Sequence, residues 1–435
     1  MRKVFCLVLL FSSVSWAQSP ADLRFLPAPS LFSPLNLPAQ ALLYSDGTYE
    51  FGKMDQELFS HKVLLLGESH WMHEIHQLLT DLVLYANTRD YYPLLVLEVP
   101  YSATAYINAY LNADSVAAQQ YVPAIKPIMK AKESWRLLRT LRAWNVEHPN
   151  KKITVACSDI EQGLGYCLKY VFDPYFKALG EQRLWPMLTQ AQDLTPQIQA
   201  FMDSVLRAAP ADFKVPDAPF LNRAFVNNVW INTKASLAAN RAMQESGYEA
   251  FAQIRAERIF QNLTDDAFFG KKLKADKTIL WGGADHTKIY DPNPGEGTLR
   301  WEGWRLAHEF GPTKGNVYAI RVTNFAYAIP ANYYQPEAYT RATESFVQLV
   351  DLFKKDVPGF TPDRYLILDE LTDVSAALAQ QSQRQNNLPV WINHAALREA
   401  ARQQPNLRND AVWQNFVGYD TVIVMPQTTL FDYGN

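Results

Sequence analysis

Short, mostly apolar runs recur along this chain, and longer stretches with helical spacing separate them. The runs lie at residues 63–67, 94–99, 153–157, 278–281, 316–322, 364–368 and 421–425. Apolar runs without alternation are typical of strands that are buried on both faces. Such strands alternating with helices predict an α/β fold, in which a mostly parallel sheet is flanked by helices.

The longest stretch between two such runs predicts a helical insertion. Residues 166–270 contain no convincing strand, and helical spacing is found at 182–207, 219–246 and 249–264. We therefore expect a single α/β domain at 44–435, with an insertion at about 166–270 that forms a cap. Further predicted elements are a hairpin around Asp46-Gly47 and helices at 102–148, 342–355, 373–385 and 394–402.

The N-terminus predicts export rather than a part of the fold. Basic residues precede an apolar run at 4–11, and Ser15 and Ala17 provide small side chains for cleavage. We expect a signal peptide at 1–17, a proline-rich arm at 18–43, and a mature protein in the periplasm or outside the cell. No later run approaches the ~18 apolar residues of a membrane span.

The composition limits the kinds of partner that this protein is expected to bind. The 435 residues are 48% hydrophobic and 20% charged, with a net charge of −3. This is typical of a globular protein, and no basic stripe favours nucleic acid. Cys157 and Cys167 remain after signal cleavage, and they could form a disulfide or be two free buried thiols.

Acidic and histidine residues end or follow four of the predicted strands. The carboxyl ends of parallel strands share one edge, where open α/β sheets bind ligands. We therefore expect one crevice to contain Glu68, His70, Glu98, Asp159, Asp285 and His286.

The first of these clusters is Glu68-Ser69-His70. A carboxylate beside an imidazole is typical of a general base or a metal ligand. The alternative, a helix N-terminus capped by Ser69, leaves His70 unexplained. Glu74 could be a further partner of His70 or an ordinary acidic residue of a first helical turn. The nearby His73 and His76 are more typical of boundary positions than of a metal pair.

Missing motifs indicate the type of reaction. The chain lacks a G-x-S-x-G elbow, a P-loop and the Rossmann glycine pattern. Direct attack by an activated water therefore fits these residues better than an acyl-serine mechanism. A metal-dependent hydrolase is a second hypothesis, because Glu68, His70, Glu98 and His286 offer N and O ligands suited to Zn, Mn or Co.

Several ordered motifs resemble the erythromycin esterase-like group, within the superfamily that also holds ChaN-type haem-binding lipoproteins and Tiki-type metalloproteases. The matching stretches are LLLGESHWMHE, VLEVPYSATAYINAYL, ESWRLLRTLRAWN, SDIEQG, IRAERIFQN, ILWGGADHTKI and GYDTVIVMPQTTLF. The resemblance implies an exported hydrolase of a small molecule, which could be bulky and apolar, with no required cofactor. It implies that His70, Glu68, Glu98 and His286 are catalytic, and that Asp159 and Arg255 position groups around them.

The ChaN-type relatives imply another alternative, a haem-binding protein that depends on His73 or His76. Two differences from the esterases also argue against a macrolide substrate. One residue separates Glu68 from His70 where the esterases usually have two, and Gly283 replaces a second histidine.

Overall fold

The computed structural model describes residues 39–70, 72–161, 163–181, 196–290, 299–324, 326–328, 366–368, 381, 388–403, 416–425 and 428–429. The predicted signal peptide, most of the proline-rich arm and the predicted helix at 342–355 lie outside the described residues. So does nearly all of the predicted helix at 373–385.

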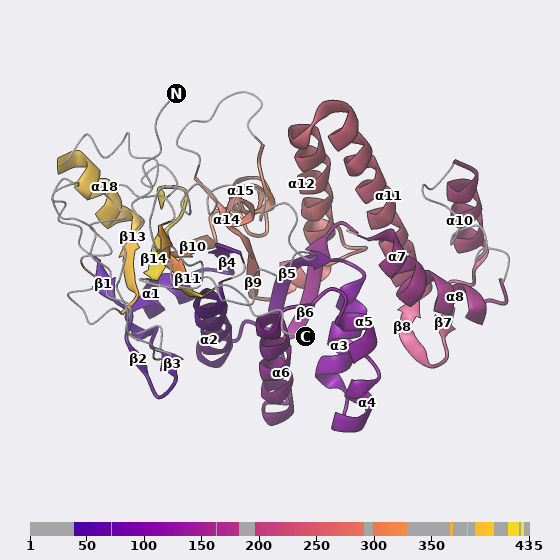
Figure 1. The fold of residues 1–435 in the computed structure, drawn as a ribbon, viewed down its shortest axis with the longest axis horizontal. Coiled ribbons are helices and arrows are strands. Elements are labelled where there is room, and N and C mark those ends of the chain that lie inside the picture. The colour runs from indigo at the N-terminus through magenta and orange to yellow at the C-terminus, as the bar shows by residue number, and fades with distance from the viewer. Residues whose placement is uncertain are drawn as a thin grey trace, which may run out of the picture.

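An eight-stranded sheet forms the centre of the fold (Figure 1). Its strands, in spatial order, are β1 (Gln40–Ala41), β13 (Val390–Asn393), β14 (Thr421–Met425), β10 (Val317–Asn324), β4 (Val63–Glu68), β9 (Thr278–Gly283), β5 (Leu94–Pro100) and β6 (Thr154–Asp159). All pairs from β14 to β6 are parallel, and β13 and β1 add an antiparallel edge. The predicted α/β class is confirmed.

The apolar runs form the centre of the sheet because both of its faces are covered. Leu64, Leu65 and Leu66 of β4 are fully buried, as is Ile279 of β9. The helix α2 (His73–Asp90) follows β4 and ends at Tyr91, whose φ of 47° is left-handed. It neighbours α6 (Lys132–Glu147), which in turn packs on α3 (Ala103–Asn112).

The helical insertion contains one hairpin that the sequence pattern does not predict. Its helices are α7 (Leu164–Cys167), a π-helical turn (Leu168–Phe172), α8 (Asp173–Ala178), α10 (Pro196–Ala208), α11 (Arg223–Ser246), α12 (Tyr248–Thr264) and α13 (Gly270–Ala275). The expectation of no strand at 166–270 is wrong, because β7 (Lys214–Val215) pairs with β8 (Ala218–Asn222). These strands are too short to give an alternating pattern. The helices α11 and α12 form an antiparallel pair that turns at Gly247, with φ of 87° (Figure 1).

Other predicted elements are found with changed limits. The hairpin at Asp46-Gly47 joins β2 (Tyr44–Ser45) to β3 (Thr48–Tyr49), and both turn residues have positive φ. The predicted helix at 102–148 is divided into α3, α4 (Ser115–Gln119), α5 (Val122–Ile125) and α6. The strand expected at 364–368 is β12 (Leu366–Leu368), in a separate sheet with β11 (Ala326–Ala328) and β15 (Thr428–Thr429).

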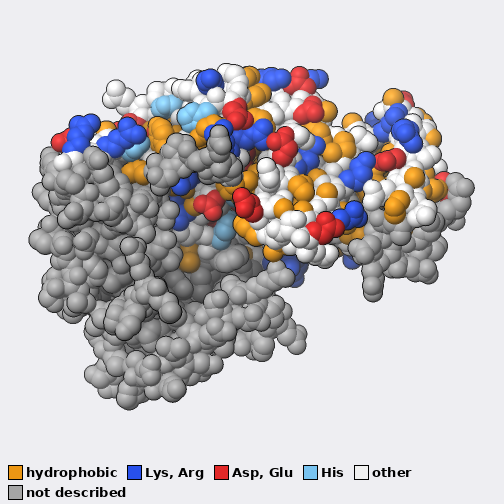
Figure 2. Space-filling model, turned by 90° about the horizontal axis from the view of Figure 1, so that it is seen from above, with side chains coloured by type: hydrophobic (Ala, Val, Ile, Leu, Met, Phe, Trp, Pro, Cys, Tyr) orange, Lys and Arg blue, Asp and Glu red, His pale blue; other side chains and the backbone are white. Residues whose placement is uncertain are grey.

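The remaining described helices are η3 (Gly52–Met54), α1 (Asp55–Phe59), α14 (Ala284–Thr287), α15 (Glu302–His308) and α18 (His394–Gln403). None of the described helices has the length and apolarity that crossing a membrane requires. On the face shown in Figure 2, basic and acidic side chains of the described residues are interspersed.

Candidate active site

The carboxyl ends of four neighbouring parallel strands bring the candidate residues together. The strands β4, β9, β5 and β6 lie side by side in this order. Glu68 pairs in register with Gly283, and Asp159 pairs with Pro100. A shift of register between Leu97 and Pro100 lies at Glu98, and such irregularities change the direction of side chains. The predicted convergence on one edge is therefore found for Glu68, Glu98 and Asp159.

Glu68 and His70 form a hydrogen-bonded pair at this edge. His70 Nδ1 lies 3.0 Å from Glu68 Oε1, and the His70 side chain is 44% exposed. Trp281 Nε1 donates to Glu68 Oε2 at 2.7 Å, which fixes the carboxylate. Burial lowers the pKa of His70, but the hydrogen bond and charge of Glu68, together with the charge of Glu98, raise it more. The net pKa is above the ordinary 6.5.

Glycine at the end of β9 lets these side chains approach the backbone. A Cβ atom on Gly283 would lie 2.6 Å from His70 Nε2, and one on Gly282 would lie 2.9 Å from Glu98 Oε2. Both distances are too short for real contacts, so any side chain here would displace the imidazole or the carboxylate.

Behind this pair, Glu98 is the centre of a buried network of charges. Its Oε1 accepts from Arg255 Nη2 at 2.6 Å and lies 3.0 Å from His286 Nε2. Its Oε2 accepts from the backbone N–H of Gly283 at 2.6 Å. Arg255 Nη1 also lies 3.2 Å from His286 Nε2, but both are donors when His286 is protonated, so Glu98 is their common acceptor.

Two further carboxylates hold the cations of this network. Arg255 donates from Nε to Asp159 Oδ1 and from Nη2 to Asp159 Oδ2, each at 2.8 Å. His286 Nδ1 lies 2.9 Å from Glu302 Oε1, and the ring of Trp301 covers the imidazole at 4.1 Å between centroids. Three carboxylates therefore surround two cations in a largely buried site.

The network determines the charge of its members. Burial lowers the pKa of His286, but the charges of Glu302 and Glu98 raise it more, to about 10. Burial raises the pKa of Glu98, but His286 and Arg255 lower it far more, so this carboxyl stays ionised. His286 is only 6% exposed, and both of its ring nitrogens face carboxylates. In this geometry His286 is better placed to hold Glu98 than to contact a substrate directly.

Two buried acids of this region, Glu302 and Glu161, were not among the site residues predicted from the sequence. Glu302 begins α15 and follows no strand, so only the folded structure brings it to His286. Glu161 follows β6 and accepts from Ser102 N at 2.8 Å and from Ser102 Oγ at 2.6 Å. Burial raises the pKa of Glu161 to about 7. A second acid two residues after Asp159 was a sequence signal for it.

Of the other candidate residues, His76 lines the same side of the sheet edge as the Glu68–His70 pair, and the rest lie apart from the cluster. Asp285 is exposed on α14. Glu74 is near Tyr49, whose pKa its charge helps to raise after the larger effects of burial and Tyr44. His73 Nδ1 pairs with Glu133 at 2.7 Å. His76 is buried against Trp281, and burial lowers its pKa to about 4. The haem alternative depended on His73 or His76: His76 is buried, and His73, whose side chain is 38% exposed, does not line the cavity beside His70.

The cysteines do not form the disulfide that their even number allowed. Both are buried free thiols, and Cys167 Sγ lies 3.2 Å from Glu161 Oε2. The Cys167 thiol is therefore directed to a carboxyl group rather than to Cys157.

The four residues proposed as metal ligands do not form a coordination site. Both oxygens of Glu98 accept N–H donors, and the cation between Glu98 and Asp159 is the guanidinium of Arg255. Among the described residues, no group of three His, Cys, Asp or Glu side chains is arranged to hold a metal ion. The donor geometry therefore gives the metal-dependent hypothesis no support.

A cavity of about 510 Å³ opens beside the Glu68–His70 pair. Its polar wall includes Glu68, His70, Glu98 and Glu161. Its apolar wall includes Leu97, Val99, Pro100, Ile128, Met129, Leu137 and Trp281. This volume lies in the ordinary range of sites for small molecules, roughly 300–1,000 Å³.

Comparisons with known proteins give the fold. No family model and no curated protein sequence matches the chain. A Bacillus cereus protein of known structure aligns with a TM-score of 0.56 and 14% identity, over 91% of this chain and 97% of the other. A mutant of the erythromycin esterase EreC, in its open conformation, aligns with a TM-score of 0.54 and 11% identity, over 90% of this chain and 98% of the other. The chain has the erythromycin esterase-like fold.

The same fold occurs in proteins with other names. A succinoglycan biosynthesis protein aligns with a TM-score of 0.53 and 11% identity, over 91% of this chain and 96% of the other. The TM-score with the haem-binding ChaN of Campylobacter jejuni is 0.26, which is too low to bear on function. The erythromycin esterase-like fold thus fits the motifs of the sequence, while the activity depends on the site itself.

Proposed function

We propose that this protein is an exported hydrolase that cleaves an ester bond with a water molecule activated by His70. The observation that carries the proposal is the exposed His70 imidazole, which is held by Glu68 in the wall of a small-molecule cavity. The likeness to the fold of an erythromycin esterase supports this class of reaction. Export rests on the signal peptide that the N-terminal sequence predicts.

The hydrogen bond of His70 determines which nitrogen acts as the base. In the neutral imidazole, Nδ1–H donates to the Glu68 carboxylate, so Nε2 carries the lone pair. Nε2 removes a proton from water as the water oxygen attacks the ester carbonyl. The imidazolium then gives this proton to the leaving alkoxide, so an acid and an alcohol are the products. The negative charges of Glu68 and Glu98 stabilise the imidazolium while it exists.

The walls of the cavity indicate the class of substrate. Apolar side chains from the end of β5 and from the segment before α6 face the cavity. Burial of matching apolar surface would provide most of the affinity, at roughly 25 cal/mol per Å². We therefore infer a compact ester with an apolar acyl or alcohol part.

An ester panel tests this function. Purified mature protein is expected to hydrolyse esters with apolar groups of increasing size, with a preference for those that fit about 510 Å³. Activity is expected to remain after treatment with a chelator, because the oxygens of Glu98 are already bonded to N–H groups. Loss of activity on chelation and its return with added metal would support a metal-dependent hydrolase instead. A stoichiometric Soret band with haem and no hydrolysis would replace the proposal with a binding function.

Replacing Glu68 with glutamine should change the pH dependence of the reaction. Glu68 raises the pKa of His70, so removing its charge lowers this pKa. His70 is the active base only above its pKa, so the acidic limb of kcat/KM should shift to lower pH. The maximal rate should also fall about tenfold or more, because the imidazole loses its orienting partner. The full pH–rate profile measures both effects, and a shift to higher pH would contradict the role of Glu68.

Replacing Gly283 with alanine should displace His70. The added Cβ would lie 2.6 Å from Nε2, so the imidazole must move. Misplacing a catalytic group by about 1 Å can lower the rate by about 10²-fold. Gly165→Ala is the matched control, because its Cβ would meet no atom within 4 Å. Equal kcat values for the two variants would show that the position of His70 next to Gly283 does not matter.

A further inference from the structure

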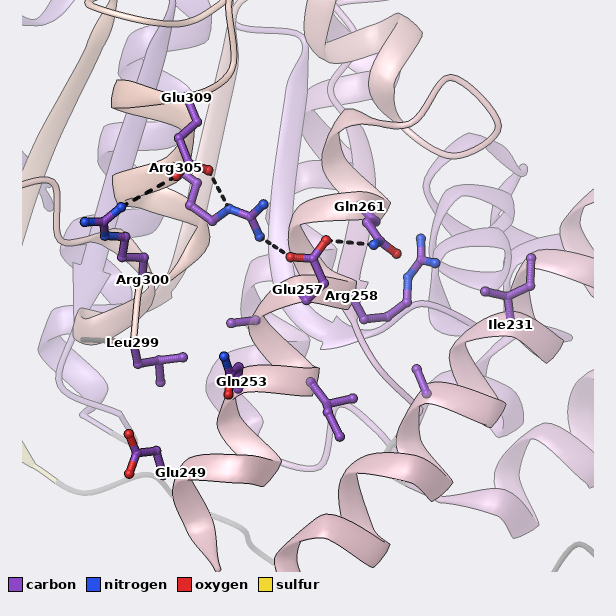
Figure 3. Close-up of a pocket in the computed structure, with 13 residues that line it drawn as sticks. Ile231, Glu249, Gln253, Glu257, Arg258, Gln261, Leu299, Arg300, Arg305 and Glu309 are labelled. Carbon is purple, nitrogen blue, oxygen red and sulfur yellow. Dashed lines mark hydrogen bonds and ion pairs between the residues drawn. The ribbon is translucent and has the colours of Figure 1, made fainter. Parts of the chain in front are cut away.

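A groove of about 890 Å³ lies between α11, α12 and α15, away from the cavity of His70 (Figure 3). Charged side chains from α12 and α15 meet across it. Arg305 of α15 donates from Nη1 to Glu257 of α12 at 2.7 Å. Figure 3 shows this bond as the link between the two helices.

Arg305 is held more firmly than an ordinary surface arginine. Its Nε donates to Glu309 at 2.9 Å, and its guanidinium lies 3.7 Å from the ring centroid of Phe260 on α12. Gln261 Nε2 donates to the second oxygen of Glu257 at 2.7 Å, which orients that carboxylate. The Arg305 side chain is 18% exposed. Arg305 therefore contacts α12 at two points, one turn of the helix apart.

The two helices joined by Arg305 carry opposite sides of the buried network. The first turn of α15 and the residue before it supply Glu302 and Trp301, which contact His286. Arg255 lies half a turn before Glu257 on α12, and it binds Glu98 and Asp159. The position of α15 against α12 thus contributes to holding His286 and Glu98 from both sides at once.

We propose that Arg305 is a positioning residue, which through Glu257 and Phe260 fixes α15 against α12 so that Glu302 and Arg255 hold the His286–Glu98 pair. The proposal rests on the hydrolase function proposed above. An ion pair with an exposed partner such as Glu257 contributes little to stability. The effect of Arg305 is therefore on geometry: without it, α15 loses its charged link to α12, and Glu302 can move away from His286.

The test uses Arg305→Met and two comparison variants in the full mature protein. Arg305→Met keeps a long side chain over Phe260 but removes both ion pairs. We expect kcat to fall about tenfold with KM nearly unchanged, because Arg305 and its partner Glu257 do not line the cavity in which the substrate would bind. Arg305→Lys keeps the charge toward Glu257 and should recover most of the activity. Arg300→Gln is the matched control. Arg300 lines the same groove, but its side chain is exposed and its contact with Glu309 is a weak one, at 3.9 Å.

A spectroscopic measurement separates this proposal from the proposed function. The imidazole N–H proton of His286, hydrogen-bonded to Glu302, should give a downfield resonance in protein with labelled histidine. This resonance should weaken or disappear in Arg305→Met and persist in Arg300→Gln. An unchanged resonance and unchanged kcat in Arg305→Met would overturn the positioning role. If the wild-type protein hydrolyses no ester, the proposed function fails, and the resonance alone still decides whether Arg305 positions Glu302.

Discussion

Replacing His70 with alanine is expected to lower kcat for ester hydrolysis by about 10²- to 10⁴-fold, the usual contribution of one general base. His70 provides the only imidazole of the cavity that is substantially exposed among the described residues, since His76 is buried against Trp281. The thermal midpoint should change little, because a side chain that is 44% exposed contributes little packing. Steady-state kinetics and thermal unfolding of the same preparations measure the two effects.

His73→Ala provides a close control for this variant. His73 also pairs through Nδ1 with a glutamate, at 2.7 Å, and its side chain is 38% exposed. It does not line the cavity of His70. We therefore expect His73→Ala to retain kcat, with any loss confined to stability because Glu133 would lose a partner. Activity that survives in His70→Ala, or disappears equally in both variants, would remove His70 from the role of base.

The position of the acids could be predicted from the sequence because it follows from the backbone. Continuous apolar runs are typical of strands that are buried on both faces, and a crossover that returns the chain between two strands makes them parallel. The residues at the end of each run then lie at the same edge of the sheet. Glu68, Glu98 and Asp159 are found there for this reason.

The partners of those acids could not be predicted from the pattern. Arg255 comes from the middle of α12, and only the family resemblance indicated it. Glu302 comes from α15, which no apolar strand precedes. The roles of His286 also depend on these helices, because two neighbouring carboxylates raise its pKa and engage both nitrogens. These contacts depend on how the helices pack against the sheet and against one another, and the hydrophobic periodicity of the sequence does not show that packing.

The two differences from the esterase pattern have one structural explanation. The short spacing in Glu68-Ser69-His70 places the imidazole against the backbone of Gly283. A second histidine at this position, as in the esterase motif, would need the space that His70 occupies. The glycine at this position in the fourth motif therefore leaves the space that His70 occupies.

Replacing Arg255 with methionine is expected to lower the free energy of unfolding by about 3–5 kcal/mol, as for other buried ion pairs that lose one partner. Methionine fills much of the volume of the arginine, so packing is only a small part of the loss. The large part comes from Asp159, which is fully buried and would lose both guanidinium bonds, and from Glu98. Denaturant unfolding at neutral pH measures the change. Arg258→Met, one turn further along α12, is the control, because Arg258 has no ion pair with a described residue and should cost about 1 kcal/mol or less.

A second substitution tests which group causes the loss of stability in Arg255→Met. If the cost of Arg255→Met comes from an unpaired carboxylate, then adding Asp159→Asn should recover part of the stability, because the buried charge is removed together with its partner. The double variant should therefore be more stable than the sum of the single effects predicts. Strict additivity of the two substitutions would instead show that Arg255 stabilises the protein through its packing, and that the network around Glu98 is not electrostatically coupled.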